Sequence, residues 1–290
     1  EKAGIFKDAG ALMLHRVGGP VVSSTDSIVL SKFVGLAAVG LYSNYALLVS
    51  ALARLLGQFL GVFTSNYGNA YATLVPADVY RLFRKMQFLN LALSGFAATG
   101  LFLLVGPFIR LWLGARFCLG TGVEAVLCAL FYLQSSWCTV GEHVTASGLF
   151  VRDRPRPLIE AALNVAVSVA LVGPLGLAGV FVGTIVSYAL TTFWRGPYLL
   201  FRLRLGRPLG AYWRQYVALA LLPVAFSAGA KALLPPEPES WLGWLGCAAA
   251  VSAAYAAAFA ALYGWTADAR AVAATLRTHL RGRLFARRSA

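Results

Sequence analysis

The sequence predicts an all-α polytopic membrane protein with about eight transmembrane helices. Hydrophobic residues make up 59% of the 290 residues, charged residues only 12%, and the mean hydropathy is +0.70. A soluble globule of this size needs more polar surface than such a composition supplies. Apolar stretches of about 20 residues, enough to cross a bilayer at a rise of 1.5 Å per residue, recur along the whole chain. Lysine and arginine are concentrated in alternate connections between these stretches.

Hydropathy places each helix in turn. The expected ranges are 9–33, 36–64, 83–105, 123–149, 158–172, 177–201, 212–234 and 241–263. The fifth range is short for a full crossing. We expect this helix to begin earlier, because Pro155 and Pro157 suit the first helical turn, where a missing N–H leaves no bond unmade.

The distribution of Lys and Arg predicts the orientation, because cytoplasmic loops carry the excess of these residues. Both ends of this chain are therefore expected in the cytoplasm, and the net charge of +14 is a topology signal beside anionic membrane lipids. A nucleic-acid partner is not expected. One set of connections holds Lys2, Lys7, Arg81, Arg84, Lys85, Arg152, Arg154, Arg156, Arg202, Arg204, Arg207, Arg214 and the arginines from Arg270 to Arg288, whereas the other holds Lys32, Arg110, Arg116 and Lys231.

The sequence indicates neither a metal centre nor an enzyme. The four cysteines form no CxxC pair, and the run "GEHVTAS" lacks the second histidine of a zinc-protease motif. There is no P-loop, no nucleophile elbow and no pair of carboxylates in a water-facing segment. We therefore expect no catalytic residues and no metal.

The first helix carries polar residues that cannot face lipid. Arg16, Gly19, Ser23 and Asp26 follow spacings of three, four and three, so they share one face, and His15 lies beside Arg16. Arg16 and Asp26 are roughly 15 Å apart along a helix, too far to neutralise each other directly. Each is expected to find a partner elsewhere, or water.

The second helix repeats this pattern around Arg54. A guanidinium at mid-membrane costs about 3 kcal/mol or more, so it marks a pathway or a binding site by default. The alternative is structural: Arg54 reaches the membrane surface, or pairs with Asp26, Glu124 or Glu142 to hold helices together. The small and polar stripe comprises Ser43, Ser50, Arg54, Gln58, Gly61 and Ser65.

Two later helices carry further candidates. Glu142, with His143 beside it, is either a buried proton relay or a helix-end carboxylate that reaches the basic loop that follows. Gly179, Gly183 and Ser187, at four-residue steps, form a small-residue ridge against which another helix can pack closely.

Two segments of the chain resemble a known family of transporters. The run from Arg152 to Arg202 resembles the late-helix signature of Wzx-like polysaccharide flippases of the MOP exporter superfamily, and residues 25–45 resemble that family's seventh helix and the turn into the eighth. Many relatives have an acidic residue before the exit proline, where this chain has Gly196. The matching positions are Asp153, Pro157, Glu160, Asn164, Gly176, Gly179, Gly183, Thr184, Ser187, Trp194 and Pro197, then Asp26, Gly35, Gly40, Tyr42, Asn44 and Tyr45.

The resemblance implies a MATE-like fold of two pseudo-symmetric six-helix lobes around a central cavity. Residues 1–208 correspond to the second lobe, 209–265 to two additional transmembrane helices, and 266–290 to a basic cytoplasmic tail. We expect an N-terminal lobe of the same chain to precede Glu1. The basic tail is expected to form a helix against anionic headgroups, with a disordered tail as the alternative.

The resemblance also implies a function. Such proteins move an undecaprenyl-diphosphate-linked oligosaccharide, a capsule, O-antigen, lipopolysaccharide or teichuronic-type repeat unit, across the bacterial cytoplasmic membrane, alongside polysaccharide polymerase machinery. Arg16, Arg54 and His15 would supply cations to the cavity, with Asn44 and Gln58 as polar partners. Asp26 would balance them or couple transport to a proton or sodium ion.

Three alternatives remain open. The nearer is a multidrug or small-molecule antiporter of the same superfamily, although exporters of organic cations need carboxylates rather than a cationic cavity. The second is a membrane-embedded polysaccharide polymerase or ligase, which should expose a large polar outer loop. The third is a scaffold that transports nothing.

Overall fold

The computed structural model describes residues 24–64, 67–233, 238–275 and 277. These residues are helical apart from short connections, and no strand lies among them. Residues 24–33 and 267–275 are also helical. The elements are α2 (Leu36–Thr64), α3 (Tyr67–Thr73), α4 (Pro76–Leu113), η1 (Ala115–Phe117), α5 (Thr121–Ser136), α6 (Cys138–Ala146), η2 (Leu149–Asp153), α7 (Arg156–Leu175), α8 (Leu177–Tyr188), η3 (Ala189–Phe193), α9 (Trp194–Leu200), η4 (Phe201–Leu205), α10 (Gly210–Leu233) and α11 (Trp241–Tyr263).

Seven helical stretches of the described chain are long and apolar enough to cross a membrane. They fall on seven of the eight predicted ranges, so the prediction of an all-α polytopic membrane protein is confirmed. The expected first helix, residues 9–33, lies mainly outside the described residues. One span joins α5 to α6, and another runs from α8 through η4, where η3 and η4 are single π-helical turns within a continuous helix.

Several helix boundaries differ from the predicted ones. Residue 83 was predicted as the start of α4 and residue 105 as its end, yet the helix extends from Pro76 to Leu113. Hydropathy detects only the apolar part of a helix, so it misses the charged turns at Arg81 and Arg84. The start of α7 agrees with the proline argument, since Pro155 is its N-cap and Pro157 lies in its first turn.

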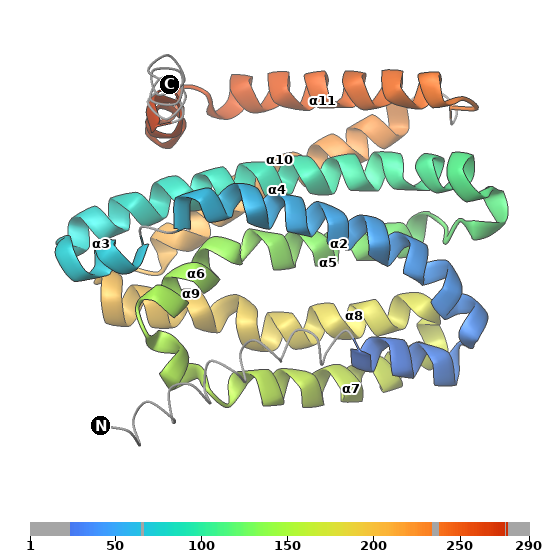
Figure 1. Ribbon diagram of the computed structural model, residues 1–290, viewed down its shortest axis with the longest axis horizontal. Coiled ribbons are helices and arrows are strands. Elements are labelled where there is room, and N and C mark those ends of the chain that lie inside the picture. Colours follow the sequence, from blue (N-terminus) through green and yellow to red (C-terminus); the bar gives the residue numbers. More distant parts are fainter. Residues whose placement is uncertain (1–23, 65–66, 234–237, 276, 278–290) are drawn as a thin grey trace, which may run out of the picture.

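The helices lie side by side along the long axis of the molecule, so their connections gather at two ends (Figure 1). One end holds the connections from α3 to α4, from α6 to α7 and from η4 to α10. The opposite end holds those from α4 to α5, from α7 to α8 and from α10 to α11. The connections rich in arginine therefore share one end, as the alternation along the sequence predicts.

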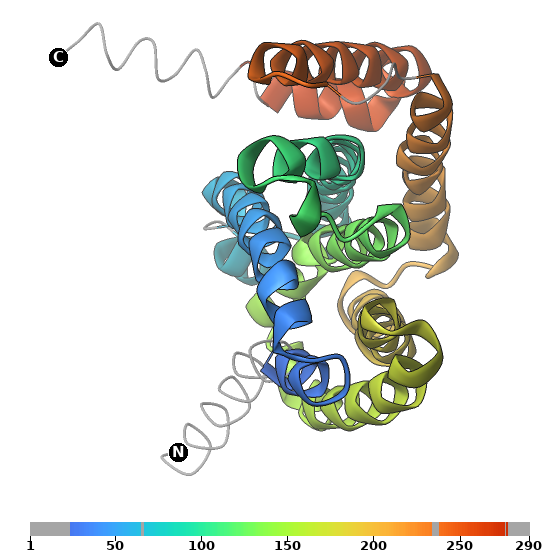
Figure 2. The same cartoon turned by 90° about the vertical axis from the view of Figure 1, so that its right-hand side faces the viewer.

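The long helix α4 occupies the middle of the bundle, where it contacts α2, α5, α6, α10 and α11. One apolar core surrounds Phe83 and Leu200, and a second surrounds Ile109 and Phe181. Helices α7 and α8 form a closely packed pair at one side of the bundle, and α10 and α11 cover α4 (Figure 2). Helix α2 lies on a different side, so the last two helices do not cover its outer face.

Candidate functional site

Helix α2 combines an apolar sequence with an open outer face. It is the least buried of the seven candidate spans, with 6% of its apolar window inside the protein. Tyr45 and Leu60 anchor its inner side in the core. Its exposed side carries the polar stripe: Gly40, Ser43, Ser50, Arg54, Gly57, Gln58 and Gly61.

The serines of this stripe and the neighbouring Asn44 are hydrogen-bonded within α2 itself. Ser43 donates to the Gly40 carbonyl at 2.7 Å, and the Asn44 amide donates to the same oxygen at 3.2 Å. Ser50 donates to the Leu47 carbonyl. Within the described residues, Arg54 makes one hydrogen bond, from Nη2 to the Ser50 hydroxyl at 3.4 Å. The guanidinium makes no ion pair with Asp26, Glu124 or Glu142. Because Arg54 is exposed, its charge points out of the described bundle.

A shallow cavity of about 230 Å³ lies between α2 and the α5–α6 span. Gln134 and Cys138 line it from the α5–α6 side. Further along that span Glu142 is exposed within the described bundle, so of the two alternatives left open for it, the carboxylate is not buried there. The buried member of the pair is His143, whose Nδ1 lies 2.9 Å from the Tyr71 hydroxyl and whose Nε2 has no partner. Aromatic rings surround this imidazole and leave its charged form without solvation.

Asp26 is buried between α7 and α8, where neutral side chains hold it. The Asn164 amide donates to Asp26 Oδ1 at 3.2 Å, and Thr184 Oγ1 lies 3.0 Å from Oδ2. Asn164 also donates to Thr184 Oγ1 at 2.9 Å, and Oγ1 lies 3.1 Å from the Val180 carbonyl. Asn164 Oδ1 is buried and has no partner. The result is a buried group of oxygen atoms with a single carboxylate.

Close packing of α7 on α8 builds this group. A Cβ atom on Gly179 would lie 2.2 Å from the Leu171 carbonyl oxygen, and one on Gly183 would lie 2.7 Å from the Ser168 backbone nitrogen. Only glycine permits this approach. Ser187, the next residue of the ridge, is fully buried and donates to the Thr184 carbonyl at 3.0 Å.

A charged cluster lies near the arginine-rich end of α7, where residues of η2, α7, η3 and α9 meet. Asp153 is buried and accepts from Arg156 Nε at 2.5 Å and from Arg195 Nε at 2.6 Å. Arg156 also pairs with Glu160 at 3.1 Å, and Glu160 accepts from Thr191 at 3.1 Å and from Thr192. The charges of two carboxylates and two arginines thus balance, and these contacts join η2 and α7 to the π-helical turn η3 and to α9.

Trp137 interrupts the α5–α6 span, which the sequence predicts as one continuous helix. The Ser136 carbonyl instead accepts from the Asn90 amide at 2.9 Å. The Trp137 indole packs on Gly196, where a Cβ atom would lie 2.8 Å from Cζ2. A side chain at position 196 would therefore displace this indole, and glycine leaves room for it. The periodicity of the sequence could not predict this contact, because Trp137 and Gly196 are far apart in the chain.

Arg16 and His15 lie outside the described residues, so the structure does not place them. Of the other candidate cavity residues, Arg54 and Gln58 share the open face of α2, and Asn44 lies half-buried on the same helix. Asp26 does not join them, because it lies in the α7–α8 cluster. Comparison with protein-family models, curated proteins and solved structures finds no significant match.

Proposed function

We propose that this chain lines one side of a transport cavity that moves an undecaprenyl-diphosphate-linked oligosaccharide across the bacterial cytoplasmic membrane. The observation that carries the proposal is the open polar stripe of α2, with Arg54 directed away from the bundle. A guanidinium in a membrane-spanning helix is too costly to leave in lipid. This face therefore needs water or a second protein surface opposite it.

A second helical lobe is the occupant that fits this face, either from the same chain or from a second copy. The stripe is rich in glycine and serine, which let helices approach closely, but Arg54 and Gln58 interrupt it with long polar side chains. Two surfaces of this kind leave a wet gap between them rather than a dry contact. The gap accommodates a polar headgroup while an attached polyprenyl chain stays in lipid.

The chemistry of the stripe favours an anionic cargo. The planar guanidinium of Arg54 forms paired hydrogen bonds with phosphate oxygens and stays charged at any physiological pH. Serine hydroxyls and the Gln58 amide are suitable partners for sugar hydroxyls. A carrier of organic cations needs a carboxylate in the corresponding place, and the open stripe of α2 contains none in the described residues.

Asp26 is the residue we propose for ion coupling. Its carboxylate, the unpaired Asn164 Oδ1 and the Thr184 hydroxyl are oxygen donors of the kind that hold a small hard cation, and a proton can occupy the same carboxylate. The three residues come from three helices. Occupation of this site would therefore change how α7 and α8 pack against residues 24–33, which lead directly into α2.

The decisive experiment replaces Arg54 in the complete reading frame and measures polysaccharide export in a strain that lacks its own flippase. Arg54→Ala should reduce export about 10- to 100-fold, the effect of losing one charge-assisted pair of about 1.5–3 kcal/mol. Arg54→Lys should retain part of the activity, because it keeps the charge without the fork.

Leu55→Ala is the matched control, because Leu55 is an exposed neighbour on the same helix, with 62% of its surface accessible. Membrane levels of all three variants are compared on immunoblots, so that failed insertion is not mistaken for failed transport. Wild-type export by Arg54→Ala, at equal membrane levels, would refute the proposed role.

A further inference from the structure

One face of the span from η3 to η4 carries four exposed side chains at four-residue steps: Leu190, Trp194, Tyr198 and Arg202. The first three are large and apolar, with exposed fractions of 58%, 43% and 42%. The fourth is an exposed arginine. Twelve residues of helix extend about 18 Å, comparable to one leaflet of a bilayer with a core of about 30 Å. We call these four residues the Leu190–Arg202 stripe.

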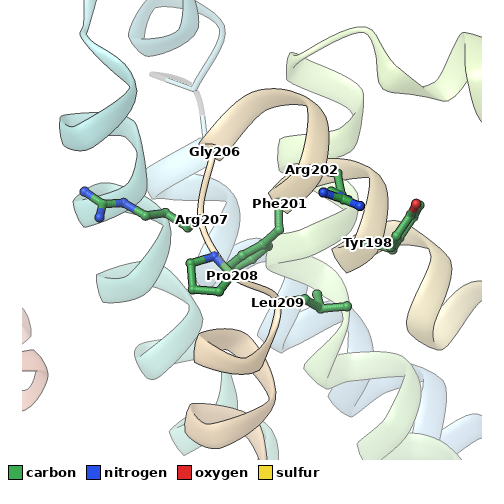
Figure 3. A pocket seen from close by; sticks show the side chains of 7 residues that line it. All are labelled: Tyr198, Phe201, Arg202, Gly206, Arg207, Pro208 and Leu209. Atoms are coloured by element: carbon green, nitrogen blue, oxygen red, sulfur yellow. The ribbon is translucent and has the colours of Figure 1, made fainter.

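The stripe ends at a cavity of about 450 Å³. Figure 3 shows Tyr198 and Arg202 on one side of the turn that joins η4 to α10, with Arg207 extending from the other side. Gly206 makes this turn possible, since its φ of +58° is left-handed. The cavity is lined by Tyr198, Phe201, Arg202, Gly206, Arg207, Pro208 and Leu209, none of them acidic.

The arginines of this cavity differ from those of the charged cluster around Asp153. Arg202 makes no hydrogen bond or ion pair within the described part of the chain. Arg207 lies over the Tyr80 ring at 5.3 Å, a contact that fixes the guanidinium without neutralising it. Helix α10 begins at Gly210, just beyond the lining residues, so the positive end of its dipole adds to the field.

A neighbouring cavity of similar size provides a contrast. Arg152 and Arg204 line it, but Arg204 is engaged, since its Nη2 donates to the Ser147 carbonyl at 2.6 Å. No described stripe of exposed aromatic side chains leads into that cavity. Arg152 makes no hydrogen bond or ion pair within the described residues, so the apolar track of leaflet length, rather than a free arginine, distinguishes the first cavity.

We propose that this cavity and the Leu190–Arg202 stripe bind one anionic phospholipid. The phosphodiester contacts Arg202, with Arg207 and the start of α10 adding positive potential, and an acyl chain lies along Tyr198, Trp194 and Leu190. Basic pockets at the ends of transmembrane helices bind anionic headgroups in this way. A soluble anion could bind the arginines, but it would not contact the apolar residues of the Leu190–Arg202 stripe.

The test measures lipid binding to the purified full chain in detergent by native mass spectrometry, with phosphatidylglycerol and phosphatidylcholine as probes. Wild-type protein should bind phosphatidylglycerol more tightly. Arg202→Ala should weaken this binding about fivefold, and adding Arg207→Ala should bring the loss to about 25-fold. Arg202→Lys should retain most of the affinity, which would separate loss of charge from misfolding.

Arg81→Ala is the matched control, because Arg81 is an exposed arginine in the first turns of α4 and pairs with Asp78 on the surface. Its affinity for phosphatidylglycerol should not change. Trp194→Ala should weaken both lipids by a similar factor, since it removes only apolar contact.

Three results would overturn the proposal. The first is wild-type affinity of the double variant for phosphatidylglycerol. The second is complete displacement of that lipid by millimolar inorganic phosphate, which would indicate a free-anion site. The third is a strong preference for a polyprenyl diphosphate over phosphatidylglycerol, which would make the cavity a substrate site. The proposal is independent of the flippase assignment, because it concerns a different face of the molecule.

Discussion

Replacing Gly179 by alanine is expected to push α7 and α8 apart. The added Cβ would lie 2.2 Å from the Leu171 carbonyl oxygen and 2.6 Å from its carbon. Because both atoms belong to backbone, no side-chain rotation relieves the contact, and the helices must separate by roughly 1 Å to reach van der Waals distance. Overpacking of this kind costs about 1–3 kcal/mol.

The measured effect has an opposing contribution, since alanine is favoured over glycine within a helix by about 0.5–1 kcal/mol. Gly100→Ala in α4 isolates that contribution, because nothing lies within 4 Å of a Cβ at this position. We therefore expect Gly100→Ala to be stabilised and Gly179→Ala to be destabilised, with a difference of about 1–3 kcal/mol between them.

The assay is reversible unfolding of both variants in mixed micelles, titrated with denaturing detergent and followed by tryptophan fluorescence and circular dichroism. A free energy of unfolding for Gly179→Ala equal to that of Gly100→Ala would refute the reasoning. It would mean that α7 and α8 have room between them. The Asp26 group, whose Asn164 and Thr184 come from these two helices, would then lose its structural explanation as well.

Two further predictions concern contacts between distant segments. Asp26→Asn should preserve the fold, since the amide oxygen, placed where Oδ1 lies, can accept from both Asn164 and Thr184. Export by this variant should no longer depend on a proton or sodium gradient. The test compares export before and after the gradient is collapsed. If collapse still reduces export by the variant as much as by the wild type, Asp26 does not couple transport to the ion. Gly196→Asp should lower the free energy of unfolding by about 1–3 kcal/mol, because its Cβ would displace the Trp137 indole. Equal unfolding curves for Gly196→Asp and wild type would show that Trp137 has another position available.

The sequence by itself determined the class of the protein and most of its elements. Partition of a helix into lipid depends on the sum of local side-chain contributions, so hydropathy located seven spans that the structure describes. Proline at the start of α7 and the concentration of arginine in alternate connections are local signals of the same kind. They required no knowledge of which helices are neighbours.

Tertiary structure decided which polar groups meet. Asp26 and Thr184 are 158 residues apart in sequence, and the sequence predicts only that Asp26 needs a partner or water, not that Asn164 and Thr184 supply it. Of the adjacent pair Glu142 and His143, periodicity did not reveal that the histidine turns inward. The direction in which Arg54 points also depends on which side of α2 the other helices cover. A buried polar group is stabilised by the particular donors that packing brings within hydrogen-bonding distance, and that packing is a property of the whole bundle.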